Sequence, residues 1–127
     1  MLTGKKVAVT GAILSGLAVA MGAFGAHALK DVLTPERLET YKTAVSYMAW
    51  HSLALFVVGF LLSKTKERLF RTAAITLLVG MLLFSGSLFA LVSTDVPLFG
   101  AITPLGGVLF ILSWILIALG AHRGLKE

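Results

Sequence analysis

The sequence contains no cysteine and has few charged residues. The absence of cysteine excludes disulfides, thiolate metal sites and cysteine nucleophiles. Only 13% of the 127 residues are charged, whereas 57% are hydrophobic. A water-soluble domain of this size could not hide so much apolar surface, because small globules leave a large share of their residues exposed. The composition therefore indicates a single domain, residues 1–127, whose main solvent is a lipid bilayer.

Apolar residues are gathered into four long runs, which predict helices at about 7–29, 35–62, 69–93 and 104–121. A membrane-spanning helix needs about 20 predominantly apolar residues. In lipid every backbone polar group must be bonded within the protein, and runs this continuous are typical of helices rather than barrel strands. We therefore predict an all-α, polytopic membrane protein, built as an up-down bundle of four transmembrane helices.

Two Thr-Pro pairs predict where two of these helices begin. Thr34-Pro35 and Thr103-Pro104 each place a capping hydroxyl before a proline, which is favoured at the first helical position. We expect the second helix to begin near Pro35 and the fourth at Pro104. Residues 96–102 would then form an apolar loop.

Lysine and arginine are distributed unevenly between the two ends of the predicted bundle. Three of them, Lys30, Arg37 and Lys42, fall at one end, and eight fall at the other: Lys5, Lys6, Lys64, Lys66, Arg68, Arg71, Arg123 and Lys126. Because cytoplasmic loops are enriched in basic residues, both termini should be cytoplasmic. The clusters are short and lie between apolar runs, so we read them as topology signals and expect no nucleic-acid partner.

The first predicted helix carries a stripe at helical spacing, formed by Ala12, Gly16, Ala20, Ala23 and His27, and small residues flank it: Gly11, Ser15, Ala18, Gly22 and Ala26. Small residues let membrane helices approach closely. We expect this helix to be the central, most enclosed one and to use the stripe for packing within the chain. A contact between copies of a homo-oligomer is the alternative use, and so small a bundle, with few internal contacts, is expected to be oligomeric. Trp50 and Trp114 lie well inside their spans and should be packing residues.

No fully charged side chain lies deep in a predicted span, whereas proton-coupled transporters usually keep one there. Polar residues of the outer half form the candidate cavity or ligand/lipid site: His27, Tyr47, His51, Ser85, Ser87 and Thr103. We expect His27 to hydrogen-bond Tyr47, at a depth of about 4–6 Å. His51 should lie level with Ser85 or Ser87, about 10–12 Å deep, with a neutral imidazole. Two interpretations stay open: hydrogen bonds that fix helix register, or a functional cavity.

The polar residues do not match a known catalytic or metal-binding pattern. Two histidines without a carboxylate or thiolate fall short of the three or four ligands usual for zinc. Serine and histidine are present, but no buried acid is available to orient a histidine base. We therefore expect no metal, no cofactor and no enzymatic activity.

Four motifs resemble one known family. The residues are 22–29 (GAFGAHAL), Tyr47 with 51–54 (HSLA), 83–88 (LFSGSL) and 102–107 (ITPLGG), and Trp114 fits the same pattern. Together they resemble domain of unknown function 423 over nearly the whole chain. The resemblance implies a small four-helix protein of the bacterial cytoplasmic (inner) membrane, and it implies no activity because the family's biochemical role is not established.

The residues and the resemblance together lead to two functional hypotheses. The first is a non-enzymatic structural or accessory membrane protein that binds lipids or partner proteins. The alternative is a small transporter or channel with a polar cavity around His27, Tyr47, His51 and Ser87. The lack of a buried carboxylate favours the first.

Overall fold

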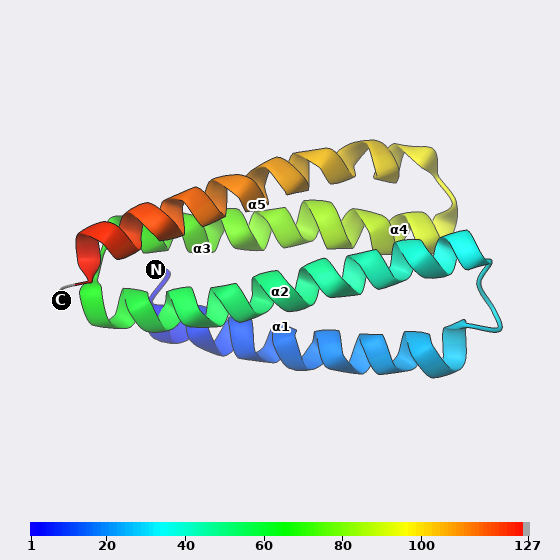
Figure 1. The fold of residues 1–127 in the computed structure, drawn as a ribbon, viewed down its shortest axis with the longest axis horizontal. Coiled ribbons are helices and arrows are strands. Elements are labelled where there is room, and N and C mark those ends of the chain that lie inside the picture. Colours follow the sequence, from blue (N-terminus) through cyan, green and yellow to red (C-terminus); the bar gives the residue numbers. More distant parts are fainter. Residues whose placement is uncertain (126–127) are drawn as a thin grey trace.

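The computed structural model describes residues 1–125, which form four long helical rods (Figure 1). The first rod is α1 (Gly4–Phe24) with the π-helical turn η1 (Gly25–Leu29), and the second is α2 (Pro35–Thr65). The third rod consists of α3 (Arg68–Met81), the π-helical turn η2 (Leu82–Gly86) and α4 (Ser87–Thr94). The fourth is α5 (Pro97–Gly124). The rods contain 26, 31, 27 and 28 residues, and each is apolar and long enough to span a membrane. The predicted up-down architecture is confirmed.

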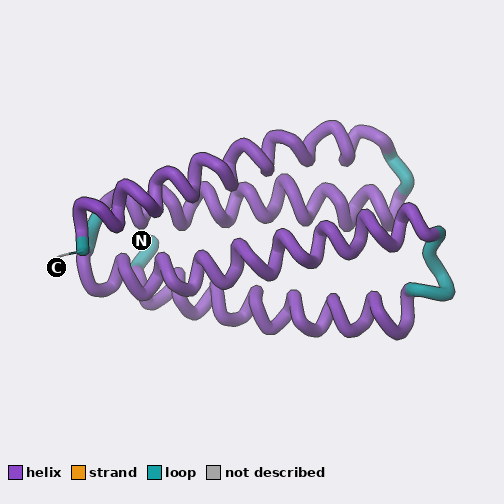
Figure 2. The backbone as a smooth tube through the Cα atoms, viewed as in Figure 1, coloured by secondary structure: helices purple, strands orange, loops and turns teal. Residues whose placement is uncertain are grey.

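Short connections join the rods at alternate ends of the bundle (Figure 2). Both described chain ends lie beside the α2–α3 connection, and the other two connections lie at the opposite end. The expected start of α2 is confirmed, because Pro35 is its first residue and the Thr34 hydroxyl accepts a hydrogen bond from the Arg37 N–H at 3.3 Å. Lys66 and Asp95 adopt left-handed backbone angles (φ 56° and 58°) and end α2 and α4.

The predicted start of the fourth helix is wrong. The helix begins at Pro97, so Pro104 is an interior residue and residues 97–102 are helical rather than a loop. Pro97 already occupies the first position, where the missing N–H costs nothing. The Thr103 hydroxyl does not cap a helix and instead donates to the Phe99 carbonyl at 3.1 Å. Interior proline is tolerated in membrane helices because neighbouring helices and hydroxyl side chains satisfy the freed backbone groups.

The prediction that the first helix is the central one is also wrong. α1 lies at the edge of the bundle and packs mainly on α2, whereas α2 also packs on α3 and α4 (Figure 1). In the most apolar stretch of each rod, 17% of residues are buried in the first rod and 44% in α2. The helix rich in large residues, rather than the one rich in small residues, is therefore the enclosed one.

α1 packs on α2 through small residues beside the predicted stripe, two of which, Gly11 and Ala18, were expected to flank it. Gly4, Gly11, Ala18 and Gly25 repeat every seven residues and are buried. At Gly11 an added Cβ would collide with the backbone of Phe56, so only glycine permits this close approach. The predicted stripe from Ala12 to His27 is exposed on the outward side. Its use in contacts between copies stays a prediction.

The apolar core lies where α2, α3 and α5 meet. Leu55 of α2 and Phe70 and Leu77 of α3 are fully buried, and Phe110 of α5 packs against the same cluster. This core holds these three rods together, and α1, which packs mainly on α2, contributes Val7 to it.

Candidate functional site

His51 lies buried on α2 and is bonded through both ring nitrogens. Its Nδ1 is 2.6 Å from the Tyr47 carbonyl oxygen, and its Nε2 accepts from the Trp114 indole N–H at 3.3 Å. The ring also stacks on Phe110, with 3.5 Å between centroids. A carbonyl only accepts and an indole N–H only donates, so these contacts fit one neutral tautomer, with its proton on Nδ1. The contact with Trp114, expected to serve only for packing, is a polar bond that the sequence did not indicate.

Ser85 and Ser87 bond to two different helices rather than to His51. The Ser85 hydroxyl donates to the Ala44 carbonyl of α2 at 2.7 Å. The Ser87 hydroxyl lies 2.7 Å from the Thr103 hydroxyl of α5. The expected pairing with His51 is wrong, and the two serines, which lie two positions apart on a helix and so point to roughly opposite sides of it, bond to different neighbours. π-Helical turns such as η2 are frequent at functional sites.

His27 does not belong to this cluster. It is exposed in η1, and the predicted hydrogen bond to Tyr47 is not formed. Gly25 packs against the Tyr41 ring, and His27, two residues later on the helix, faces away. Tyr47 instead stacks on Phe84, with centroids 4.3 Å apart. The tyrosine that bonds the first helix is Tyr41, whose hydroxyl donates to the Met21 carbonyl at 2.6 Å.

Two further hydroxyl pairs connect the rods. Ser15 of α1 donates to Ser52 of α2 at 3.0 Å, and Ser113 of α5 donates to Thr76 of α3 at 2.7 Å. Sequence reasoning missed both pairs, and the only signal was the presence of hydroxyl residues within apolar spans. Such bonds fix the register between membrane helices.

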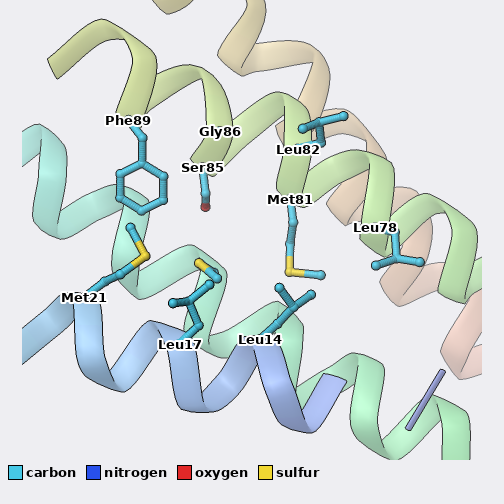
Figure 3. Close-up of a pocket in the computed structure, with 10 residues that line it drawn as sticks. Leu14, Leu17, Met21, Leu78, Met81, Leu82, Ser85, Gly86 and Phe89 are labelled. Carbon is cyan, nitrogen blue, oxygen red and sulfur yellow. The ribbon is translucent and has the colours of Figure 1, made fainter. Parts of the chain in front are cut away.

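An apolar groove separates α1 from the rod formed by α3, η2 and α4 (Figure 3). It exists because α1 packs mainly on α2, which leaves these two rods apart. Its volume is about 410 Å³. In Figure 3, Leu14 and Met21 extend from α1 toward Met81 and Phe89 on the opposite wall. The lining also includes Leu17, Met48, Leu78, Leu82, Ser85 and Gly86.

The groove continues toward the end of the bundle that carries the α1–α2 connection. A second hollow of about 540 Å³ shares Met21 and Phe89 with the groove and reaches Arg37, Tyr41 and Ser93. The Arg37 guanidinium at this mouth forms an ion pair with Asp95 at 2.8 Å. The lining therefore changes from apolar at mid-bundle to polar at the surface.

The described part of the chain, residues 1–125, brings no three histidine or acidic side chains together in a way that could hold a metal ion. The expectation that no metal or cofactor is bound stays a prediction.

Comparison with known proteins decides the family. Residues 21–107, which include both π-helical turns and most of the groove, match the family described as "Protein of unknown function (DUF423)". The chain belongs to the DUF423 family. This confirms the resemblance drawn from the four motifs.

Relatives of this DUF423 chain match it over nearly its whole length. The UPF0382 membrane protein YwdK of Bacillus subtilis is 46% identical over 94% of this chain and 98% of its own. The UPF0382 inner membrane protein YgdD of Escherichia coli is 33% identical over 96% of this chain and 93% of its own. No solved structure matches the chain. With four spanning helices and relatives of this kind, this DUF423 chain is an integral membrane protein.

Proposed function

We propose that the protein is a non-enzymatic accessory protein of the bacterial cytoplasmic membrane that holds one phospholipid in the groove between α1 and the α3–η2–α4 rod. The observation that carries the proposal is the groove itself, which is apolar at mid-bundle and ends at the Arg37–Asp95 ion pair. Its volume of about 410 Å³ lies within the range of about 300–1,000 Å³ usual for small-molecule sites.

The length of the groove supports a lipid as its occupant. Leu29 lines the outer hollow and Leu14 lines the inner end of the groove. Fifteen helical residues between them span about 22 Å. Half of a bilayer with its headgroups measures about 20–22 Å. One phospholipid of the outer leaflet would therefore extend from the polar mouth to mid-bundle.

The alternative, a transporter or channel around His27, Tyr47, His51 and Ser87, receives less support. Both nitrogens of His51 and the hydroxyls of Ser85 and Ser87 are already bonded within the bundle. His27 faces outward, away from the other three residues. These bonds favour a scaffold role for the cluster.

Filling the groove tests the proposal. Gly86 lies on the groove wall, and an added Cβ there would meet only ordinary contacts. Gly86→Phe should place its ring in the groove without moving the backbone. Gly16→Phe is the matched control, because Gly16 has open space on the outward side of α1. Native mass spectrometry would count the lipids retained by protein extracted from phosphatidylethanolamine–phosphatidylglycerol vesicles.

We expect one phospholipid to stay with the wild-type chain and with Gly16→Phe, and to be lost from Gly86→Phe. Retention by Gly86→Phe equal to that of the wild type would overturn the proposal. The proposal would also be overturned if the wild-type chain retained no lipid and formed a dimer, and if Gly86→Phe dissociated that dimer. A second copy of the chain would then fill the groove.

A further inference from the structure

A separate hollow lies at the opposite end of the bundle, where the described termini meet. It has a volume of about 360 Å³ and opens beside Lys5, Lys66 and Arg71. Among residues 1–125 no acidic side chain contributes to its lining, and the chain from Met1 to Leu2, together with Leu62, supplies an apolar edge. Three basic residues therefore line one small space next to the expected membrane surface.

Arg71 gives this hollow a specific chemistry. Its Nε is buried and has no hydrogen-bond partner among residues 1–125. A buried donor without a partner is costly, most of all on a charged group. The neighbouring acid, Glu67, uses its carboxylate to cap the Leu69 N–H at 3.2 Å. An oxygen-rich anion in the hollow would supply the acceptor that Arg71 lacks.

We propose that this hollow binds the phosphate of an anionic phospholipid of the cytoplasmic leaflet. Arg71 donates to a phosphate oxygen, Lys5 and Lys66 add positive charge, and the apolar edge faces the acyl chains. Basic pockets between transmembrane helices on the cytoplasmic side suit anionic headgroups. A zwitterionic lipid fits poorly because its ammonium would lie among three cations. The site is independent of the groove and does not rest on the proposed function.

The positive-inside rule alone does not account for this arrangement. Arg68 begins α3, is exposed and would serve that rule equally well, yet it does not line the hollow. Arg68 and Arg71 therefore form a matched pair with the same charge, on one helix and one turn apart. A site at the hollow requires Arg71, whereas general surface attraction would use both residues alike.

The experiment compares Arg71→Gln with Arg68→Gln in the full chain. Each protein is reconstituted in phosphatidylcholine vesicles that contain a minority of phosphatidylglycerol, and native mass spectrometry measures the phosphatidylglycerol retained. Arg71→Gln should weaken retention by at least about tenfold, because it removes a direct hydrogen bond between charged groups. Arg68→Gln should weaken it by no more than about fivefold, the effect of one basic residue near an anionic membrane surface. Arg71→Lys, which keeps the charge but loses Nε, should fall between wild type and Arg71→Gln.

Three outcomes would overturn the site. Equal losses of retained phosphatidylglycerol in Arg68→Gln and Arg71→Gln would show that the lipid is held by general surface charge rather than by the hollow. Equal retention of phosphatidylcholine and phosphatidylglycerol by the wild type would remove the headgroup preference. Displacement of the lipid by inorganic phosphate alone would assign the hollow to the free anion. Thermal melting of each variant without phosphatidylglycerol identifies a loss that follows from misfolding, and Arg71→Lys then decides the result.

Discussion

The bonds around His51 explain how an imidazole remains buried within a membrane span. Nε2 receives the Trp114 N–H, Nδ1 faces the Tyr47 carbonyl, and Phe110 covers one ring face. The ring is thus satisfied without a charge partner or a water molecule. It joins α2 to α5, two rods whose backbones approach each other closely at few positions.

A double-mutant cycle measures this bond. His51→Leu leaves the Trp114 N–H without an acceptor, and Trp114→Phe leaves His51 Nε2 without a donor. The coupling energy between the two changes should be about 0.6 kcal/mol, the average for hydrogen bonds between membrane helices. Reversible unfolding of the two single variants and the double variant in detergent or bicelles would give the value.

His51→Gln distinguishes the scaffold role from proton or ligand handling. Glutamine keeps a donor and an acceptor but loses the stacking on Phe110, so the scaffold role requires lower stability. Flux lost from proteoliposomes with unchanged stability would contradict that role and restore the transporter hypothesis.

The sequence predicted part of the candidate site's membership but not its pairing, because His27 lies outside the cluster and Trp114 was not expected in it. Ser87 and Thr103 both belonged to the predicted polar set and their hydroxyls are bonded, but depth had matched Ser87 with His51, and Thr103 was expected to cap a helix. Depth does not specify the rotation of a helix about its axis. His27 consequently faces outward, and Tyr41 rather than Tyr47 bonds the first helix.

At the scale of helices, glycine determines how closely two rods approach. Gly11 brings α1 against the backbone of Phe56, and Gly106 brings α5 against the backbone of Phe84 in η2. Gly16, only five residues beyond Gly11, has open space around it. On one side of α1 glycine therefore allows close packing against α2, whereas on the other side it makes no packing contact.

A pair of alanine substitutions tests this contrast. Gly11→Ala should lower the free energy of unfolding by about 1–3 kcal/mol, because the added methyl forces the backbones apart. Gly16→Ala should raise it by about 0.5–1 kcal/mol, the usual advantage of alanine over glycine within a helix. Equilibrium unfolding in bicelles gives both values, and a Gly11→Ala variant as stable as the wild type would refute the packing described for α1.

The errors at the helix scale have a physical origin. A Thr-Pro pair is compatible with a helix start and equally with a helix interior, where the hydroxyl bonds back to a carbonyl. Pro35 is the first case and Pro104 the second. The first helix carries small residues on adjacent faces, and the sequence does not show which face has a partner. The π-helical turns had no sequence signal that we recognised.

For the molecule as a whole, the basic residues mark one end of the bundle. Seven of the eight predicted cytoplasmic ones lie in the described chain around the α2–α3 connection and the two ends, and Lys126 lies outside the described residues. Hydropathy and charge predicted the number of spans and placed these ends together. The hydropathy and the flanking charge of a span can be read from that span alone, because they do not depend on how the spans pack.

Reporter fusions test the orientation. A fusion at Glu127, which also lies outside the described residues, and one at the α2–α3 connection should both report the cytoplasm. An insertion beside Asp95 should report the opposite side of the membrane. Eight basic residues lie at one end of the bundle and three at the other, and the end with more basic residues stays in the cytoplasm. A reversed pattern would contradict the orientation and would place the anionic-lipid hollow in the wrong leaflet.

The peripheral position of α1 also bears on how the protein is made. Because α1 packs mainly on α2, the pair can form once residue 65 has left the ribosome, before all of α3 has emerged. Synthesis delivers the N-terminal part first. Assembly should therefore proceed as two hairpins in succession, with the outward-facing edge of α2 waiting for the second. The groove would form last, when the later hairpin docks on α2 and leaves α1 apart.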